Sequence, residues 1–457
     1  MHLFNTLTGA IEPLRSRDEG RIGIYVCGPT VQGPPHFGHA RTYTTTDVLR
    51  RFLEWTGVDV FVVRNITDIE DKIITSAAEE GRTAASLAEH YTRVWEHEIA
   101  RLGIRPPDVT PRATGHVPEI LELITLLIER GAAYAAGGDV YFSVRAFEDY
   151  GKLSGRRPDE LRVGARVAPD ERKRDPLDFV LWKGAKPGEP TWNSPWGPGR
   201  PGWHIECSAM STKYLGADFD LHVGGTDLRF PHHENEIAQW EAATGTPFAH
   251  HWMHTGMLTL DNTKMSKSVG NIISLAEATD RYGAATLRMF YLRAHYRRPV
   301  EFSEARLEEA AAAYERMAGF VRSTAELAAG EPLHRAPVEE FREALEDDLS
   351  TPRALAGLFD LVAEGNQALE AGDTARAGAV RAIVVELAGV LGFDFVEATG
   401  GDERLVNGLI GELVSLRDEA RDQRDFATAD RIRDHLHKLG VELSDGREGT
   451  RWRIVRR

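Results

Sequence analysis

The segment 22–41 constrains the fold of this chain more than any other stretch of the sequence. It opens with Ile22–Val26, an apolar and partly β-branched run with the length of a buried strand. Glycines and prolines between Gly28 and Pro35 then break the regular structure. The pattern therefore predicts a short buried strand that runs directly into a loop.

A helix is predicted to begin after this loop, near His36–His39. Apolar residues recur from there at the spacing of one helical face, at Val48, Phe52 and Trp55. The N-terminus of a helix presents free N–H groups and a positive dipole end, which favour phosphate. Gly38, between the two histidines, leaves room for a flat ligand or its phosphates to approach. By itself, the segment His36–His39 is also typical of a loop with solvated histidines.

Further strands and helices place this unit in a parallel sheet. Val58–Val63 is predicted to be the next strand, and a strand–helix–strand unit at this spacing implies parallel pairing. Asp218–Val223 is predicted to be a later strand that ends in the loop Gly224–Asp227. Trp203–Met210 opens a helix, and Pro231–Trp240 is predicted as a helix with proline in its first turn. These elements indicate an α/β fold with a Rossmann-like parallel sheet.

The character of the chain changes outside these elements. Residues from about 105 to 200 are rich in Arg, Pro, Gly and Trp and are interpreted as an insertion into the parallel-sheet domain. Residues 1–300 are predicted to form that domain, residues 301–394 a helical bundle and residues 395–457 a small C-terminal domain. The helices predicted in the second half are Ser303–Ala329, Val338–Leu369, Ala375–Leu391, Glu403–Arg421 and Phe426–Leu439.

The composition excludes several classes of protein. No run of about 18 apolar residues is present, so no membrane span is predicted. The N-terminus lacks the pattern of a signal peptide, and a cytoplasmic location is expected. The net charge of −15 argues against a surface that generally coats nucleic acid, although a local basic groove remains compatible with it. The chain has two cysteines, and a reducing compartment disfavours a disulfide between them.

Four separated residues form a candidate metal site. Cys27 follows the first strand, Cys207 lies early in a predicted helix, and His232 and Glu236 are four residues apart. Two thiolates, an imidazole and a carboxylate are a plausible set of zinc ligands. The alternative is that both cysteines are structural and that His232, His233 and Glu236 lie on a solvated helix face.

The chain resembles the cysteinyl-tRNA synthetases, a family of class I aminoacyl-tRNA synthetases, over essentially its whole length. His36–His39 matches the class signature usually quoted as HIGH, with Phe37 in place of Ile, and Lys264–Ser268 matches KMSKS without change. Segments similar to elements specific to this family are Tyr25–Thr30, Arg64–Ile69, Gly202–Met210, Phe230–Glu236, Asp425–Arg433 and Gly449–Trp452. The last two resemble the end of the family that recognises the anticodon.

This resemblance implies an activity and a set of site residues. Members of the family activate L-cysteine with ATP and transfer it to tRNA(Cys), and their zinc binds the sulfur of the substrate. The residues implied are zinc ligands Cys27, Cys207, His232 and Glu236; the ATP site His36, Gly38, His39, Asp227, Lys264 and Lys267, with both histidines and both lysines catalytic; and the amino-acid pocket Thr67, Trp203 and His222. Mg²⁺ is expected to accompany ATP. No membrane partner is expected, and the chain is expected to be a monomer.

Some features leave other interpretations open. The loop Gln32–Pro35 replaces a bulkier segment expected before the first signature, so the resemblance does not extend to the detailed shape of the amino-acid site. Trp203 could instead pack in the core, and His233 and His254 are expected behind the ligands or in solvent. The competing functions are a ligase that joins activated cysteine to an amino sugar, a non-catalytic paralogue that binds RNA or senses zinc, and a nucleotidyltransferase. Residues 300–457 argue against the first and the intact signatures against the second, while a nucleotidyltransferase would not need the four candidate metal ligands.

Overall fold

The computed structural model describes residues 1–160, 171–260, 263–264, 273–328, 336–395, 403–446 and 449–454. Within these ranges, the side chains of residues 260, 263–264, 403–407, 445–446, 449, 451 and 453–454 are outside the description. The chain forms two compact units, Met1–Phe393 and Asp394–Arg457. The predicted domain boundary at residue 300 falls inside the first unit and stays a prediction.

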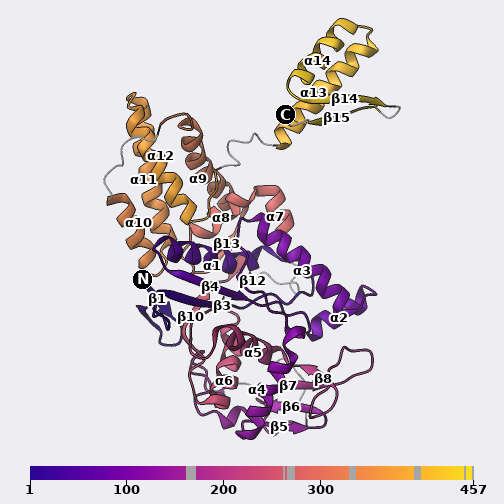
Figure 1. Cartoon of the computed structure of the whole chain (residues 1–457), viewed down its shortest axis with the longest axis vertical. Coiled ribbons are helices and arrows are strands. Elements are labelled where there is room, and N and C mark those ends of the chain that lie inside the picture. The colour runs from indigo at the N-terminus through magenta and orange to yellow at the C-terminus, as the bar shows by residue number, and fades with distance from the viewer. Residues whose placement is uncertain are drawn as a thin grey trace. The chain divides into compact units, whose positions relative to one another are not determined.

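A four-stranded parallel sheet forms the centre of the first unit (Figure 1). Its spatial order is β10, β9, β3, β4, and every neighbouring pair is parallel. The bounds are β3 Arg21–Val26, β4 Asp59–Arg64, β9 Phe219–Gly225 and β10 Ala249–Thr255. The strand order changes direction at β3, because β4 follows it on one side and β9 lies on the other. Such a reversal opens a crevice at the carboxyl ends of the strands, here those of β3 and β9.

Helix α1 (Phe37–Trp55) connects β3 to β4 and confirms the predicted strand–helix–strand unit. Val48 and Phe52 are buried, as expected for the inner face of the helix, and Trp55 is half-buried. The helix packs against β4 and β9. Its first turn therefore lies at the crevice, and this places the first signature beside the ends of the strands.

The predicted insertion contains a separate antiparallel sheet with the order β5, β6, β7, β8. Ile120 of α4, Trp182 of β7 and Ala238 of α6 belong to one apolar core that joins this sheet to three helices. The bounds are α2 Asp71–Glu79, α3 Ala84–Arg101, α4 Val117–Glu129, β5 Ala133–Ala136, β6 Asp139–Phe142, β7 Phe179–Gly184, β8 Gly199–Pro201, α5 Trp203–Leu215 and α6 Glu234–Thr244. In Figure 1 the antiparallel sheet and helices α4, α5 and α6 lie below the parallel sheet, whereas α2 and α3 lie to its right.

The prediction of one helix over Pro231–Trp240 is wrong at its start. Helix α6 begins at Glu234, and Pro231 lies in a preceding π-helical turn at Arg229–His233. Phe230 is extended, with φ −142° and ψ 131°. A residue before proline is pushed into this extended region, and it interrupts the helical hydrogen bonding. His232 therefore lies ahead of α6, while Glu236 lies in its first turn.

The prediction of one helical segment over Val338–Leu369 is also wrong, because two helices occupy it. Helix α10 (Ala336–Glu346) and helix α11 (Thr351–Glu370) are separated by Asp348 and Leu349, whose φ angles are 54° and 49°. A proline in the first turn of α11 prevents the helix from continuing through this point. The carboxylate of Asp348 accepts hydrogen bonds from the backbone N–H of Phe4 and the hydroxyl of Tyr296.

The remaining elements of the first unit are a hairpin, a small sheet and helices that pack together. The hairpin pairs β1 (His2–Asn5) with β2 (Ala10–Pro13). The small sheet has the order β12, β11, β13, in which β11 is parallel to β13 and antiparallel to β12. The bounds are β11 Leu258–Leu260, β12 Thr263–Lys264, α7 Leu275–Tyr282, α8 Ala284–Leu292, β13 Val300–Phe302, α9 Glu304–Ser323 and α12 Thr374–Val390.

The second unit pairs two helices with a hairpin. Its elements are α13 Glu403–Asp422, α14 Phe426–Lys438, β14 Val441–Gly446 and β15 Gly449–Ile454, and the two strands are antiparallel. Val414 and Leu436 are buried in its core, and Trp452 packs against that core while remaining partly exposed. Among the described helices of the whole chain, none combines the length and the apolar character needed to cross a membrane.

Candidate functional site

A cleft of about 630 Å³ opens at the reversal of the strand order. The predicted site residues that line it are Cys27, His36, Gly38, His39, Thr67, Trp203, Cys207, Asp227 and His232. His222 and Glu236 are fully buried and are not among the residues that line it. Lys267 and the side chain of Lys264 lie outside the described residues. The structure thus brings together predicted residues that are up to about 200 positions apart in sequence.

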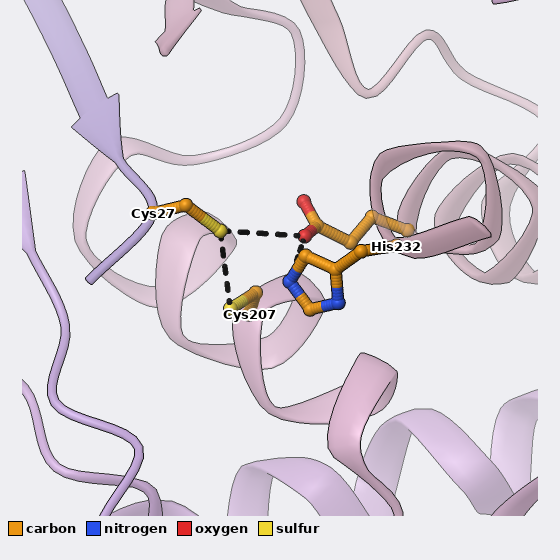
Figure 2. A group of neighbouring side chains, drawn as sticks. Cys27, Cys207 and His232 are labelled. Carbon is orange, nitrogen blue, oxygen red and sulfur yellow. Dashed lines mark hydrogen bonds and ion pairs between the residues drawn. The ribbon is translucent and has the colours of Figure 1, made fainter. Parts of the chain in front are cut away.

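The four candidate zinc ligands converge at this cleft. Figure 2 shows Cys27, Cys207 and His232, which line the cleft, and the buried Glu236 completes the group. Cys27 follows β3, Cys207 lies on α5, His232 lies in the turn before α6, and Glu236 lies in the first turn of α6. Each residue offers one ligand atom, and these atoms lie within 4.8 Å of one another. All four side chains are buried, so the alternative of a solvated helix face for His232, His233 and Glu236 is wrong.

The geometry of the cluster fits a tetrahedral metal ion. The Sγ atoms of Cys27 and Cys207 are 3.8 Å apart, and Cys27 Sγ is 3.8 Å from Glu236 Oε1. Two sulfur ligands about 2.3 Å from a tetrahedral zinc ion are about 3.8 Å from each other. Two sulfurs, one nitrogen and one oxygen are a donor set that zinc accepts. The residues present therefore fit zinc.

The charges in the cluster are strongly coupled. Burial raises the pKa of Glu236, but His222 and His232 outweigh this effect and hold that pKa well below its usual range. Burial lowers the pKa of His232, yet the neighbouring Glu236 and Cys207 raise it to about 10. The hydrogen bond from Cys27 lowers the pKa of Cys207 to about 6 despite its burial. These pKa shifts favour a Cys207 thiolate and a Glu236 carboxylate paired with a protonated His232, and a bound metal cation would take the place of that proton.

Trp203 and His204 orient the ring of His232. The indole of Trp203 stacks on this ring with centroids 4.5 Å apart. His204 Nδ1 lies 2.9 Å from His232 Nδ1, and His232 Nε2 lies 2.8 Å from Glu236 Oε1. A partner on one ring nitrogen fixes the direction of the other nitrogen toward the metal position. The sequence reasoning did not identify His204, although its place in the segment Gly202–Met210, three residues before Cys207, was a usable signal.

A chain of buried polar side chains lies behind the ligands. His222 Nε2 is 2.6 Å from Glu236 Oε2, and His233 Nδ1 is 2.8 Å from His254 Nε2. His254 Nδ1 is in turn 2.8 Å from Thr6 Oγ1. Burial lowers the pKa of His254 to about 3, so this ring is neutral near pH 7. The expectation that His233 and His254 could lie in solvent is wrong, whereas a position behind the ligands agrees with these contacts.

The histidines of the first signature lie at the start of α1. The rings of His36 and His39 are stacked with centroids 3.4 Å apart, and the backbone N–H of His36 donates to His39 Nδ1 at 3.3 Å. Gly38 lines the cleft between them. Asp227 is exposed in the loop that follows β9. The N-terminus of α1 and both imidazoles therefore line one side of the cleft, and Asp227 lines it from the loop after β9.

Asn65 joins the ends of β3 and β4 beside Thr67, and the sequence reasoning did not single it out. Its Oδ1 accepts from the N–H of Gly28 at 2.7 Å, and its Nδ2 donates to Thr67 Oγ1 at 3.3 Å. A Cβ atom on Gly28 would lie 1.5 Å from the carbonyl oxygen of Asn65, so only glycine fits there. This contact holds the loop after Cys27 against the predicted amino-acid pocket.

Two family models match successive segments of the chain. Residues 13–312 match the family model described as tRNA synthetases class I (C) catalytic domain, and residues 340–396 match the DALR domain. A cysteine--tRNA ligase of Heliobacterium modesticaldum is 46% identical over 99% of each chain. A cysteine--tRNA ligase of Halorhodospira halophila is 48% identical over 100% of each chain.

Solved structures with low sequence identity share the fold. The methionyl-tRNA synthetase of Mycobacterium tuberculosis in complex with methionyl-adenylate has a TM-score of 0.61 at 18% identity, covering 81% of this chain and 90% of that one. A LeuRS of Agrobacterium radiobacter K84 in a ternary complex has a TM-score of 0.60 at 11% identity, covering 85% and 86%. These structures show the shared fold, while the family model over residues 13–312 and the full-length relatives show that the chain belongs to the cysteine--tRNA ligase family of class I tRNA synthetases.

Proposed function

We propose that this chain activates L-cysteine with ATP and transfers the cysteinyl group to the 3′ end of tRNA(Cys). The observation that carries this proposal is the buried set of Cys27, Cys207, His232 and Glu236, three of which line the same cleft as His36 and His39. Full-length similarity to cysteine--tRNA ligases supports it further. The match over 99% to 100% of each chain disfavours the shorter ligase that would join cysteine to an amino sugar.

Zinc is the resident metal that these four ligands suit best. Bound there, zinc would favour the sulfur of L-cysteine as a thiolate over the hydroxyl of serine. Trp203 and Thr67 line the cleft beside these ligands and are proposed to close the amino-acid pocket, with His222 acting through Glu236. A pocket of this kind does not need a separate editing site, because an unmet polar contact already rejects the wrong substrate.

The nucleotide is proposed to bind on the side of the cleft formed by α1. His36 and His39 are proposed to donate hydrogen bonds to the phosphates of ATP, beside the N–H groups of the helix N-terminus. Asp227 is proposed to accept hydrogen bonds from the ribose hydroxyls. Lys264 and Lys267 are proposed to neutralise the charge that develops at the α-phosphate, and Mg²⁺ would accompany the nucleotide.

We expect one zinc ion per chain in protein purified without added metal, as measured by elemental analysis. The variants Cys207→Ala and Glu236→Ala should each lose it, because three ligands bind a structural or substrate-binding zinc far more weakly than four. Glu241→Ala is the matched control, since Glu241 lies on the same helix and pairs with Lys152. A normal zinc content in both ligand variants would contradict the assignment.

We expect the C-terminal unit to be needed for tRNA charging and dispensable for cysteine activation. Removal of residues 395–457 takes away a unit that is compact by itself and leaves the cleft intact. Charging of tRNA(Cys) should fall sharply, and tRNA affinity should depend less steeply on salt, because fewer phosphate contacts remain. Equal charging of tRNA(Cys) by the truncated and the full chain would refute the role of this unit in charging. Loss of cysteine-dependent pyrophosphate exchange in the truncated chain would show that cysteine activation also needs this unit.

A further inference from the structure

The two proposed walls of the amino-acid pocket belong to different parts of the first unit. Thr67 lies in the segment that connects β4 to α2, whereas Trp203 begins α5, two residues after the last strand of the antiparallel sheet. Both residues line the cleft, as does Lys72 in the first turn of α2. The space between these walls therefore depends on how the insertion is held against the segment 65–72.

The wall that carries Thr67 is attached to the parallel sheet. The N–H of Thr67 donates to the carbonyl oxygen of Pro29 at 3.0 Å, and the carbonyl oxygen of Thr67 accepts from the N–H of Val31 at 3.2 Å. Both partners lie in the loop that follows β3 and Cys27. The position of Thr67 is thus fixed relative to the carboxyl end of β3.

The wall that carries Trp203 is attached to the antiparallel sheet. The N–H of Gly202 donates to the carbonyl oxygen of Leu181 in β7 at 2.8 Å. A Cβ atom on Gly202 would lie 2.2 Å from the carbonyl oxygen of Val180, so the backbone passes β7 in a contact that only glycine allows. The position of Trp203 is thus fixed relative to β7.

A cluster of four charged side chains joins these two parts, and we call it the bridge. It consists of Asp71 at the start of α2, Lys183 on β7, Arg200 on β8, and Glu189 in the loop between β7 and β8. The carboxylate of Asp71 accepts hydrogen bonds from Lys183 Nζ and from Arg200 Nη2. Arg200 Nε also donates to Glu189 Oε2 at 2.9 Å. One carboxylate of the segment after β4 therefore holds two strands of the insertion.

The bridge lies close to both walls along the chain. Asp71 comes four residues after Thr67, and Arg200 comes three residues before Trp203. The side chain of Arg200 is 2% exposed, and an ion pair with such a buried partner is screened little by salt. Burial raises the pKa of Asp71, but the hydrogen bonds from Lys183 and Arg200 outweigh this effect and lower it to about 2. The bridge therefore stays charged near pH 7.

We propose that the bridge sets the width of the amino-acid pocket and thereby helps to exclude thiol amino acids longer than cysteine. This inference rests on the proposed function. None of the four bridge residues lines the cleft, so each is a positioning residue that acts through the wall next to it. A zinc ion that binds sulfur does not by itself distinguish cysteine from L-homocysteine, which carries the same thiol on a side chain one methylene longer. The separation of the walls can make this distinction.

The test compares cysteine with L-homocysteine in ATP–pyrophosphate exchange by the full chain. Asp71→Ala removes the acceptor that Lys183 and Arg200 share. We expect the preference for cysteine, measured as the ratio of the two kcat/KM values, to fall about 10-fold, within the range that one methylene is worth. The KM for cysteine should rise, while kcat and the zinc content stay near those of the wild-type protein, because the lost contacts affect binding alone.

A second variant and a matched control complete the design. Lys183→Ala removes one contact of the bridge and should also lower the preference for cysteine, so it decides the matter if Asp71→Ala does not fold. The double variant should lower the preference no further than Asp71→Ala alone, because both changes break the same contact. Asp175→Ala is the control, since Asp175 pairs with Arg145 inside the insertion at 3.0 Å and does not line the cleft. This control should leave the preference unchanged.

Three results would overturn the inference alone. An unchanged preference in Asp71→Ala, or in Lys183→Ala where the former does not fold, would mean that the bridge does not set the pocket. An equal loss of kcat/KM for both amino acids would mean a general loss of structure. The same fall in preference in Asp175→Ala would mean that any ion pair of the insertion has this effect. Absence of cysteine-dependent exchange in the wild-type chain would instead refute the proposed function, and the inference with it.

Discussion

Replacement of His232 by glutamine should lower cysteine-dependent pyrophosphate exchange about 10⁴-fold, to the level that serine supports in the wild-type protein. Glutamine approximates the size and polarity of histidine but is a poor zinc ligand. With the metal lost, nothing in the pocket would distinguish a thiolate from a hydroxyl. The measurement compares initial exchange rates with saturating cysteine and with serine, for both the wild-type protein and the variant.

His116→Gln serves as the control for folding. His116 is 6% exposed and lies away from the cleft, where its ring nitrogens contact the carbonyl oxygen of Arg112 at 2.7 Å and the hydroxyl of Tyr214 at 2.9 Å. It thus matches His232 in burial and in hydrogen bonding, and its variant should keep zinc and cysteine specificity. Retention of a large preference for cysteine in His232→Gln would show that selectivity does not come from the metal.

Lys267→Ala should reduce the rate of cysteinyl-adenylate formation about 10²- to 10³-fold, with little change in the KM for ATP or cysteine. The reason is that the α-phosphate gains charge density in the transition state, where a fixed cation is most effective. An interaction that forms mainly in the transition state lowers kcat rather than raising KM. Single-turnover rates of adenylate formation at saturating ATP measure this directly.

Lys213→Ala is the corresponding control, because Lys213 is an exposed lysine of α5 that pairs with Glu119 and does not line the cleft. It should leave both kcat and KM unchanged. A raised KM for ATP with normal kcat in Lys267→Ala would assign this lysine to binding of the ground state instead.

The elements formed by local patterns could be predicted from the sequence. The strand at Ile22–Val26, the helix that buries Val48 and Phe52, and their parallel pairing with the next strand follow from periodicity and connection length. The residue types made Cys27, Cys207, His232 and Glu236 a plausible set of zinc ligands, but only the resemblance favoured their convergence, because spacing alone cannot bring together residues as distant as Cys27 and Cys207. Their convergence depends on the strand order, in which β9 pairs with β3 across almost 200 residues.

The predictions that failed involve contacts that no local pattern records. Two helix boundaries were misplaced at Pro231 and near Asp348, where a proline acts together with distant partners. Asn65 and Arg200 were not identified because their roles lie in hydrogen bonds to groups elsewhere in the chain. A polar residue has the same appearance in a sequence whether it faces solvent or a buried partner.

The distance between Cys27 and Cys207 also bears on the order of events during synthesis. They are separated by 180 residues, so at about 5 to 20 residues per second the first thiol precedes the second by about 10 to 40 seconds. His232 and Glu236 emerge later still. During this interval Cys27 has no other ligand of the cluster to share a metal with. The proposed metal therefore cannot assist the folding of the first strand–helix–strand unit during this interval, because the ligand set is complete only after the insertion and Glu236 have been made.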